Sequence, residues 1–294
     1  MTTSLRDALV GLRVYVPLRF VYQSLFNRDA ILRRKARRQF YSSFLHPGDL
    51  VFDVGANLGN YAEALCAVGA TVVAIEPDPR NVKILKKRLR RDHVHIEPCA
   101  LGRTEGSADL RIASDRVDLS TLSKRWAENQ KADWQGTVRV PVRTLDSIAN
   151  EYGIPKYVKV DAEGYDAEVL RGMSFRPEIV SFEFLPEDMD IARECIQFFP
   201  ECAFNFVIEQ RSRFELNRWV SSEEILPALL DLPKTVLYGD VFTKSPVERL
   251  LAGGTFFGGE LGDQPGVKKS DTPASAAKAA PDSGFTFCSV LAFA

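Results

Sequence analysis

The segment VFDVGANLGNY, residues 51–61, constrains the fold of this chain more than any other feature. An apolar run rich in β-branched residues ends at Asp53, and Gly55 and Gly59 punctuate the turn before a helical stretch that starts at Tyr61. This order predicts a strand, a tight loop and a helix. Exposed N–H groups at the start of such a helix favour the carboxylate or phosphate of a cofactor. The segment therefore predicts a cofactor site at the end of the first core strand.

A second strand is predicted over Thr71 to Ile75, and Glu76 follows it directly. An acid at the tip of the second strand, about 20 residues after the glycine loop, accepts hydrogen bonds from ribose hydroxyls. NAD and S-adenosylmethionine sites share this feature, and the loop distinguishes them. A dinucleotide loop has glycines where this chain has Asn57 and Asn60, and no Gly-Lys pair followed by Ser or Thr is present. The loop favours S-adenosylmethionine first and NAD second.

Composition excludes several classes of protein. The 294 residues are 45% hydrophobic and 26% charged, with a net charge of −1, so nothing in the overall charge attracts nucleic acid or an anionic membrane. The five cysteines are scattered without a CxxC pair, which indicates reduced thiols and no zinc site. No uninterrupted apolar span is long enough to cross a bilayer. We therefore expect a cytoplasmic protein that binds no nucleic acid, and the sequence assigns no metal ligands and leaves a metal requirement open.

Three zones are predicted along the chain. Residues 1–46 are expected to form a helical extension with a basic cluster over 33–38. The first interpretation of this cluster is a solvated helix face, and the second is weak contact with a membrane surface. Residues 47–245 alternate between strands and helices, which predicts an α/β fold with a mostly parallel sheet covered by helices on both faces. Residues 246–294 are of low complexity, and we expect them to be disordered. Nothing in the sequence indicates an oligomeric state.

Carboxylates follow two further predicted strands of the central zone. Asp161 ends the run that starts at Tyr157, Glu163 lies two residues later, and Glu183 lies in the strand predicted over 179–184. Because ligands bind beyond the carboxyl ends of parallel strands, Asp161 or Glu163 is predicted to act as a base or a polar anchor for a substrate hydroxyl. The alternative is that Glu163 only stabilises the start of the next helix. For Glu183, a structural role in an alternating strand is the first interpretation and a role in substrate binding the second.

A polar segment from Ser114 to Gly136 interrupts the alternation of strands and helices. Insertions of this length are usually functional loops or disordered ones. Because Trp126 and Trp134 argue against disorder, we expect a lid or substrate-recognition loop whose aromatic faces suit a sugar or another ring.

Two candidate strands at the end of the central zone, residues 204–209 and 235–243, are predicted to add antiparallel edge strands.

With these residues in view, the chain resembles the FkbM family of S-adenosylmethionine-dependent methyltransferases. Six blocks carry the resemblance, in the family's order: DVGANLGNY, AIEPDPRN, CALG, VPVRTLDSI, KVDAEGYDAEVLRGM and SFEF, all between residues 53 and 184. The resemblance implies a class I methyltransferase, Rossmann-like fold and O-methylation of a hydroxyl on a sugar, a glycan or a natural product.

The resemblance also assigns cofactor-binding residues. The methionine end of S-adenosylmethionine would be held by the loop residues Asp53, Gly55, Asn57, Gly59 and Asn60. Glu76 would bind the ribose, and Ala100 and Leu101 would lie beside the adenine. Many methyltransferases have an acid or an amide just before these last two residues, whereas this chain has Cys99, so adenine recognition would rest on backbone groups.

Two alternatives to an active methyltransferase stay open at this level. One is a catalytically inactive binding protein with a methyltransferase fold, since a fold does not guarantee activity. The other is an NAD-dependent oxidoreductase, against which the missing glycines of the loop argue. The predicted partner is a small-molecule or glycan acceptor with a hydroxyl group.

Overall fold

The computed structural model describes residues 28–113, 119–130, 132–209 and 211–246. Strands and helices alternate from β1 (Leu50–Val54) through α4 (Asn60–Val68), β2 (Thr71–Ile75) and α5 (Pro79–Arg88) to β3 (Val94–Glu97). The three strands pair in parallel, with Asp53 opposite Ala74 in the register. The predicted strand, glycine loop and helix at the start of the core are therefore present.

The main sheet has seven strands in the order β10-β11-β9-β8-β1-β2-β3. Its second half consists of β8 (Tyr157–Val160), β9 (Ile179–Phe184), β10 (Ala203–Ile208) and β11 (Gly239–Lys244). Only β11 runs antiparallel to its neighbours, so the predicted α/β fold with a mostly parallel sheet is confirmed. The chain reverses its direction of progress across the sheet between β1 and β8, which is where open α/β sheets bind ligands.

One predicted edge strand is wrong. The segment predicted over 235–243 contains β11, and β11 lies inside the sheet with β9 on one side and β10 on the other. Of the two predicted segments, only the one that contains β10 forms an edge strand. Chain order does not reveal this insertion, because an antiparallel strand can pair on either side with equal backbone chemistry.

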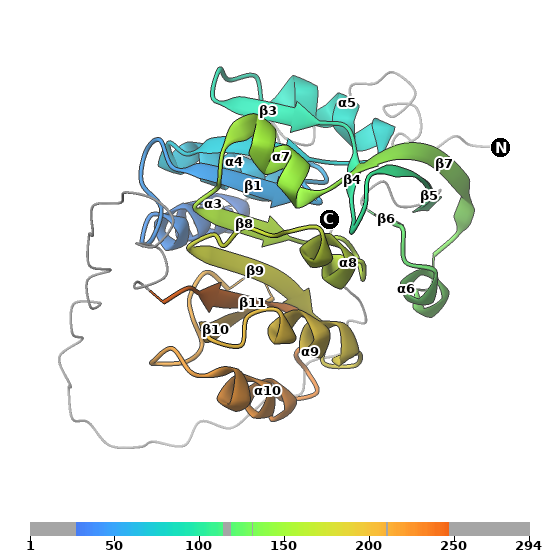
Figure 1. The fold of residues 1–294 in the computed structure, drawn as a ribbon. Helices are drawn as coiled ribbons and strands as arrows, with labels where there is room; N and C mark the ends of the chain where they lie inside the picture. Colours follow the sequence, from blue (N-terminus) through green and yellow to red (C-terminus); the bar gives the residue numbers. More distant parts are fainter. Residues whose placement is uncertain (1–27, 114–118, 131, 210, 247–294) are drawn as a thin grey trace, which may run out of the picture.

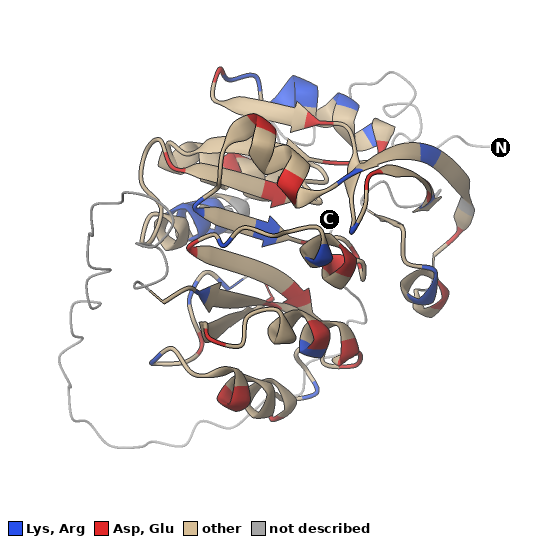
Figure 2. Cartoon of the chain, viewed as in Figure 1, with Lys and Arg blue, Asp and Glu red and all other residues tan. Residues whose placement is uncertain are grey.

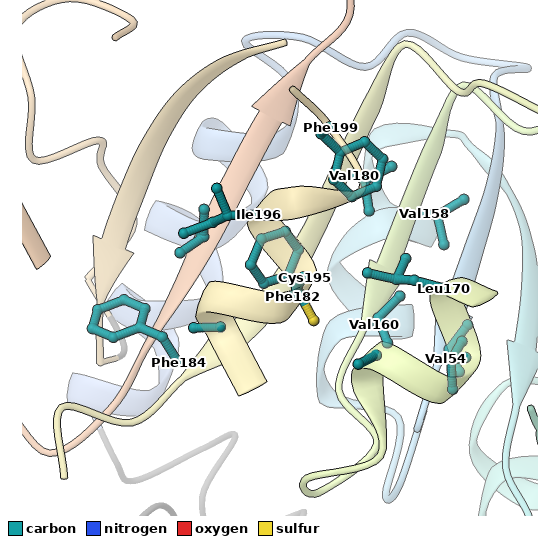
Figure 3. Close-up of a cluster of buried hydrophobic side chains, with 14 of the residues drawn as sticks. Val54, Val158, Val160, Leu170, Val180, Phe182, Phe184, Cys195, Ile196 and Phe199 are labelled. Atoms are coloured by element: carbon teal, nitrogen blue, oxygen red, sulfur yellow. The ribbon is translucent and has the colours of Figure 1, made fainter. Parts of the chain in front are cut away.

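Helices cover both faces of the sheet (Figure 1). Four of them, α7 (Leu145–Tyr152), α8 (Asp166–Arg171), α9 (Asp190–Gln197) and α10 (Ser222–Leu230), bury apolar side chains on one face. Figure 3 shows this core, where Val158, Val160 and Phe182 point from the sheet toward Leu170 and Cys195 of the helices. The other face is covered by α3 (Arg28–Tyr41), α4 and α5.

The helix α3 is packed onto the sheet although it belongs to the predicted N-terminal extension. Tyr41 and Phe44, at and beyond its end, are buried and lie with their rings 5.9 and 5.7 Å from that of Tyr157 in β8. Phe40 contacts Phe242 of β11 with ring centroids 5.5 Å apart. Residues 1–27 of the predicted extension and 247–294 of the predicted tail lie outside the described part of the chain.

A second sheet lies beyond the carboxyl ends of the parallel strands (Figure 1). It contains β4 (Ala100–Leu101), β5 (Gly106–Ala113), β6 (Ser120–Thr121) and β7 (Trp134–Arg143), in the order β4-β7-β5-β6. The helix α6 (Lys124–Asn129) joins β6 to β7. The described part of the polar segment 114–136 is thus folded, while residues 114–118 and 131 lie outside the description.

No helix in the described ranges has both the length and the apolar character that crossing a membrane requires.

Candidate cofactor and acceptor site

A cavity of about 170 Å³ lies at the carboxyl ends of the parallel strands. It is lined by residues at or just beyond the carboxyl ends of β1, β2, β3, β8 and β9, by Ser120 and Thr121 of the second sheet, and by Leu122 next to them. Figure 2 shows acidic residues at the arrowheads of β1, β3 and β9, on the edge of the sheet where this cavity lies. The cavity therefore occupies the topological switch point, and carboxylates are prominent among the charges around it.

The loop after β1 is shaped by backbone contact. Gly55 has φ +76°, and a Cβ at this position would lie 1.8 Å from the carbonyl oxygen of Asp161. Any side chain here would therefore separate the loops that follow β1 and β8. Asn57 has φ +51°, a region that Asn enters more readily than most residues. Gly59, with φ +81°, begins α4 and faces Leu85 and Leu89 rather than the cavity.

The Glu76 carboxylate lies at the end of β2 and is shared between two backbone donors. The N–H of Asn57 donates to Oε2 at 2.7 Å, and the N–H of Asp78 donates to Oε1 at 2.8 Å. Burial raises the pKa of Glu76 to about 7, against the lowering effect of these hydrogen bonds. The carboxylate is thus oriented by the chain, lines the cavity and is able to accept further hydrogen bonds from hydroxyl groups.

The wall next to Glu76 is apolar. Pro77, Cys99, Ala100, Leu101 and Leu110 line this part of the cavity. None of these side chains presents a carboxylate or an amide, and burial raises the pKa of the Cys99 thiol to about 12. A flat, largely apolar ring such as adenine fits such a wall, with its polar edge left to backbone groups.

Asp53 lies beneath the loop rather than in the cavity. Its side chain is buried, and neither carboxylate oxygen makes a hydrogen bond of ordinary geometry within the described residues. Burial raises its pKa to about 6, while the neighbouring Lys159 cation opposes that rise. Lys159 stands opposite Asp53 in the register of β1 and β8, so the two charges share one buried layer of the sheet.

Lys159 also connects this buried layer to the cavity. Its Nζ donates to Oδ2 of Asp161 at 2.6 Å and lies 4.3 Å from the ring centroid of Tyr61. Burial lowers the pKa of Lys159, but the charges of Asp161, Asp240 and Asp53 more than offset this and hold it well above its usual value. The ammonium group therefore stays charged and fixes the Asp161 carboxylate at the cavity wall.

Three carboxylates line the part of the cavity near β8 and β9: Asp161, Glu163 and Glu183. Glu163 has φ +50° and Gly164 has φ +81°, so the loop after β8 makes two left-handed steps in succession. A non-glycine residue such as Glu163 keeps a left-handed backbone conformation only where surrounding contacts hold it there. Burial, together with the charges of Asp161 and Glu163, raises the pKa of Glu183 well above its usual value.

The second sheet is attached to the loop after β8. The Thr121 hydroxyl donates to the carbonyl oxygen of Glu163 at 2.7 Å. Trp126 is buried, and its side chain leaves no room for a Cβ at Gly164, where the nearest atom would be 2.6 Å away. The Nε1 of Trp134 donates to the carbonyl oxygen of Ala127 at 3.0 Å.

The expectation that both tryptophan faces serve a substrate is therefore wrong, because both rings take part in packing within the second sheet and against Gly164. The residues of this segment that line the cavity are instead Ser120, Thr121 and Leu122.

The structure brings most of the predicted site residues together. Gly55, Asn57, Asn60, Glu76, Ala100, Leu101, Asp161 and Glu163 line the cavity. Asp53 and Gly59 do not line the cavity. Asp53 lies beneath the loop, and Gly59 faces Leu85 of α5. No three His, Cys, Asp or Glu side chains of the described ranges are grouped so that they could hold a metal ion.

Among the lining residues that were not predicted to belong to the site are Arg37, Tyr165 and Tyr238. Arg37 lies in the basic cluster for which the sequence favoured a solvated helix. A signal was present in the spacing, because Arg37, Tyr41 and Phe44 follow one another at helical intervals and so share a face with two aromatic anchors. Tyr238 precedes β11, and its position follows from the insertion of that strand beside β9.

Comparisons with known proteins agree with this geometry. The model of the methyltransferase FkbM domain matches residues 53–206. Hexuronic acid methyltransferase AglP of Haloferax volcanii is 28% identical over 136 residues, which cover 46% of this chain and 54% of that protein. 31-O-demethyl-FK506 methyltransferase FkbM of Streptomyces tacrolimicus is 31% identical over 105 residues, which cover 34% of this chain and 38% of that protein. The chain thus spans about half, or less, of the length of these curated relatives.

Among solved structures, precorrin-6y C5,15-methyltransferase of Geobacter metallireducens is 11% identical, with 74% of this chain and 89% of that chain covered and a TM-score of 0.37.

Proposed function

The chain belongs to the FkbM family of S-adenosylmethionine-dependent methyltransferases, and from that premise we propose that it methylates a hydroxyl group on a sugar, a glycan or a natural product. The observation that carries the proposal is one cavity that joins Glu76 at the end of β2 to the carboxylates at the ends of β8 and β9. A cofactor whose ribose is followed by a reactive sulfonium and an amino-acid end would fit a cavity that joins these groups. The class of acceptor is supported by the two relatives, whose names give a hexuronic acid and 31-O-demethyl-FK506.

The residues present fit S-adenosylmethionine. Glu76 offers oriented carboxylate oxygens for the ribose hydroxyls, and the apolar wall around Ala100 and Leu101 suits the adenine. The glycine loop exposes backbone to the cavity at Gly55. Near β8, the carboxylates of Asp161 and Glu163 favour a ligand that carries positive charge, as the sulfonium and ammonium groups of this cofactor do.

When bound, the cofactor supplies an activated methyl group, and the protein's main task is to position the acceptor oxygen in line with it. The carboxylates of Asp161, Glu163 and Glu183 are the candidates for taking the proton from the acceptor hydroxyl. A base adds about 10²- to 10⁴-fold to the rate when its pKa lies near the operating pH. Among the three, we propose Glu183 as the base, since its pKa is raised, and Asp161 as an anchor for the hydroxyl, since Lys159 holds its carboxylate.

The test is methyl transfer from methyl-labelled S-adenosylmethionine to a panel of hexuronic acids, neutral sugars and polyhydroxylated macrolides. We expect at least one acceptor to be labelled, and Glu183→Gln to lower kcat by about 10²- to 10⁴-fold while S-adenosylhomocysteine still binds. Glu187→Gln, at an exposed carboxylate of the loop after β9, is the matched control and should leave kcat unchanged.

Two results would count against these assignments. Full activity of Glu183→Gln, with loss in Asp161→Asn or Glu163→Gln, would move the role of base to one of those residues. Tight binding of S-adenosylhomocysteine with no labelled product across the panel would favour a binding protein with a methyltransferase fold.

A further inference from the structure

The charges around the cavity are unevenly distributed. From β2 to β9 its acidic lining residues are Glu76, Asp161, Glu163 and Glu183. Within the described residues, Arg37 is the one Lys or Arg side chain that lines it. Arg37 reaches the cavity from α3, which lies outside the residues 53–206 matched by the family model.

Arg37 is held at the start of α4. Its guanidinium lies 4.5 Å from the ring centroid of Tyr61, and Nη1 donates to the carbonyl oxygen of Asn60 at 3.4 Å. Neither contact neutralises its charge, and in the described ranges no carboxylate lies within ion-pair distance of it. Its neighbour Arg34, by contrast, is paired with Glu63 at 3.8 Å. The charge of Arg37 lowers the pKa values of the nearby Asp240 and Asp53, so these carboxylates offset part of it. Its guanidinium, with several N–H donors, nevertheless lines the cavity with no carboxylate of the described residues at ion-pair distance.

The position of this guanidinium is rigid because α3 is anchored. Phe40, Tyr41 and Phe44 pack against aromatic rings of the sheet at centroid distances of 5.5 to 5.9 Å. Tyr61, on which Arg37 stacks, is itself in the first turn of α4. The backbone N–H groups of that turn lack helical partners, and the positive end of the helix dipole adds to the charge of Arg37.

S-adenosylmethionine carries one anionic group, the carboxylate of its methionine part. The acidic lining residues near β8 and β9 would serve the ammonium and sulfonium groups of the same part. With the ribose at Glu76, the methionine part would pass Gly55 toward α4, where Arg37 lies. A carboxylate placed among those acids without a cation would be repelled, and a guanidinium pairs with it through two parallel hydrogen bonds.

We propose that Arg37 binds the methionine carboxylate of S-adenosylmethionine, an inference that rests on the proposed function and extends the cofactor site into α3. The helix before the matched domain is then part of the cofactor site and not a separate extension. The same chemistry, a carboxylate on a guanidinium, could come from an acidic acceptor such as a hexuronic acid, and the experiment separates the two sources.

The experiment compares two ligands by calorimetry. S-adenosylhomocysteine has the amino-acid end, whereas 5′-methylthioadenosine keeps the adenosine and the sulfur but lacks that end. We expect Arg37→Gln to weaken S-adenosylhomocysteine about 10- to 100-fold, as loss of a charged hydrogen-bonded pair does, and to leave methylthioadenosine unchanged. Arg37→Lys should weaken S-adenosylhomocysteine by less, because it keeps the charge and loses the fork. Arg38→Gln, at the exposed neighbouring position, is the control and should change neither affinity.

Each other outcome overturns the inference in a recognisable way. Equal weakening of both ligands would make Arg37 a structural residue of the cavity wall. Unchanged affinity for both ligands, with a raised KM for a hexuronic acid but not for a neutral sugar, would assign the guanidinium to the acceptor. Failure of the wild-type chain to bind either ligand would refute the proposed cofactor itself, and so would be distinct from failure of the Arg37 assignment.

Discussion

At the scale of single residues, the site depends on carboxylates whose charge is conditional on pH. Glu76 has its pKa raised to about 7 by burial, although two backbone N–H groups donate to it. Ribose hydroxyls donate hydrogen bonds best to the ionised form, so ligand binding favours loss of the proton. The cofactor affinity of this chain should therefore depend on pH through Glu76.

We predict that affinity for S-adenosylhomocysteine falls as the pH drops below about 7. The fall should approach tenfold per pH unit when Glu76 is largely protonated, since the ligand then has to displace a proton. Calorimetric titrations at pH 5.5, 6.5, 7.5 and 8.5 measure this. Glu76→Gln should bind more weakly at high pH and lose the dependence between pH 5.5 and 7.5. An unchanged pH profile in Glu76→Gln would mean that another group titrates.

At the scale of elements, the second sheet and the loop after β8 are linked at adjacent residues. The hydrogen bond from Thr121 reaches Glu163, and Trp126 packs against Gly164. The strained backbone at these positions is held from the side of the second sheet. The wall of the cavity and the candidate catalytic loop are therefore expected to behave as one unit.

We predict that these two contacts are energetically coupled. Thr121→Val should lower the free energy of unfolding by about 1 to 3 kcal/mol, because the hydroxyl both donates to the Glu163 carbonyl oxygen and accepts from the Ser123 N–H. Trp126→Ala should lower it by about 3 to 5 kcal/mol through the cavity it leaves. The double variant should depart from additivity by about 0.5 kcal/mol or more, because both contacts hold the same loop. Urea unfolding measures all three, with Thr137→Val on the exposed surface of β7 as a control expected within about 0.5 kcal/mol of wild type. Strict additivity would show that the contacts act independently.

At the scale of the whole molecule, several buried or half-buried acids lie at the carboxyl edge of the main sheet. Burial raises the pKa values of Asp53 and Asp240 to about 6 and those of Glu76 and Asp166 to about 7. In the unfolded chain these groups titrate near 4, so between pH 4 and 7 the folded chain binds more protons. The free energy of unfolding then decreases as the pH rises through this window.

We predict that the ligand-free protein is more stable at pH 5.5 than at pH 8. Each of these acids contributes a slope of at most about 1.4 kcal/mol per pH unit between its unfolded and folded pKa values. Asp166→Asn should make the slope shallower and raise stability at pH 8, because the buried charge is removed and an acceptor for the Ala162 N–H is kept. Urea unfolding at pH 5.5, 7 and 8 gives the slopes, with the exposed Asp231→Asn as control. A free energy of unfolding that rises with pH in wild type would contradict the prediction.

Much of the architecture and of the cofactor loop could be predicted from the sequence because their determinants are local. The run before Asp53, Gly55 and the acid Glu76 all lie between Val51 and Glu76, and this short stretch encodes a strand, a loop and a second strand directly. Asp161 could be placed on the same edge because it follows a parallel strand. For these residues, sequence spacing and spatial proximity coincide.

What only the tertiary structure decided was which distant residues meet at that edge. Backbone chemistry does not choose the side on which β11 pairs, so its insertion beside β9 and the arrival of Tyr238 followed from packing. Burial decided that Trp126 packs on Gly164 instead of facing the cavity. Arg37 looked like one of several solvated cations, and the aromatic anchors Tyr41 and Phe44 directed it inward. The sequence by itself determined the local units and the cofactor class they suit, whereas side-chain packing between units far apart in the chain determined the remaining walls of the site.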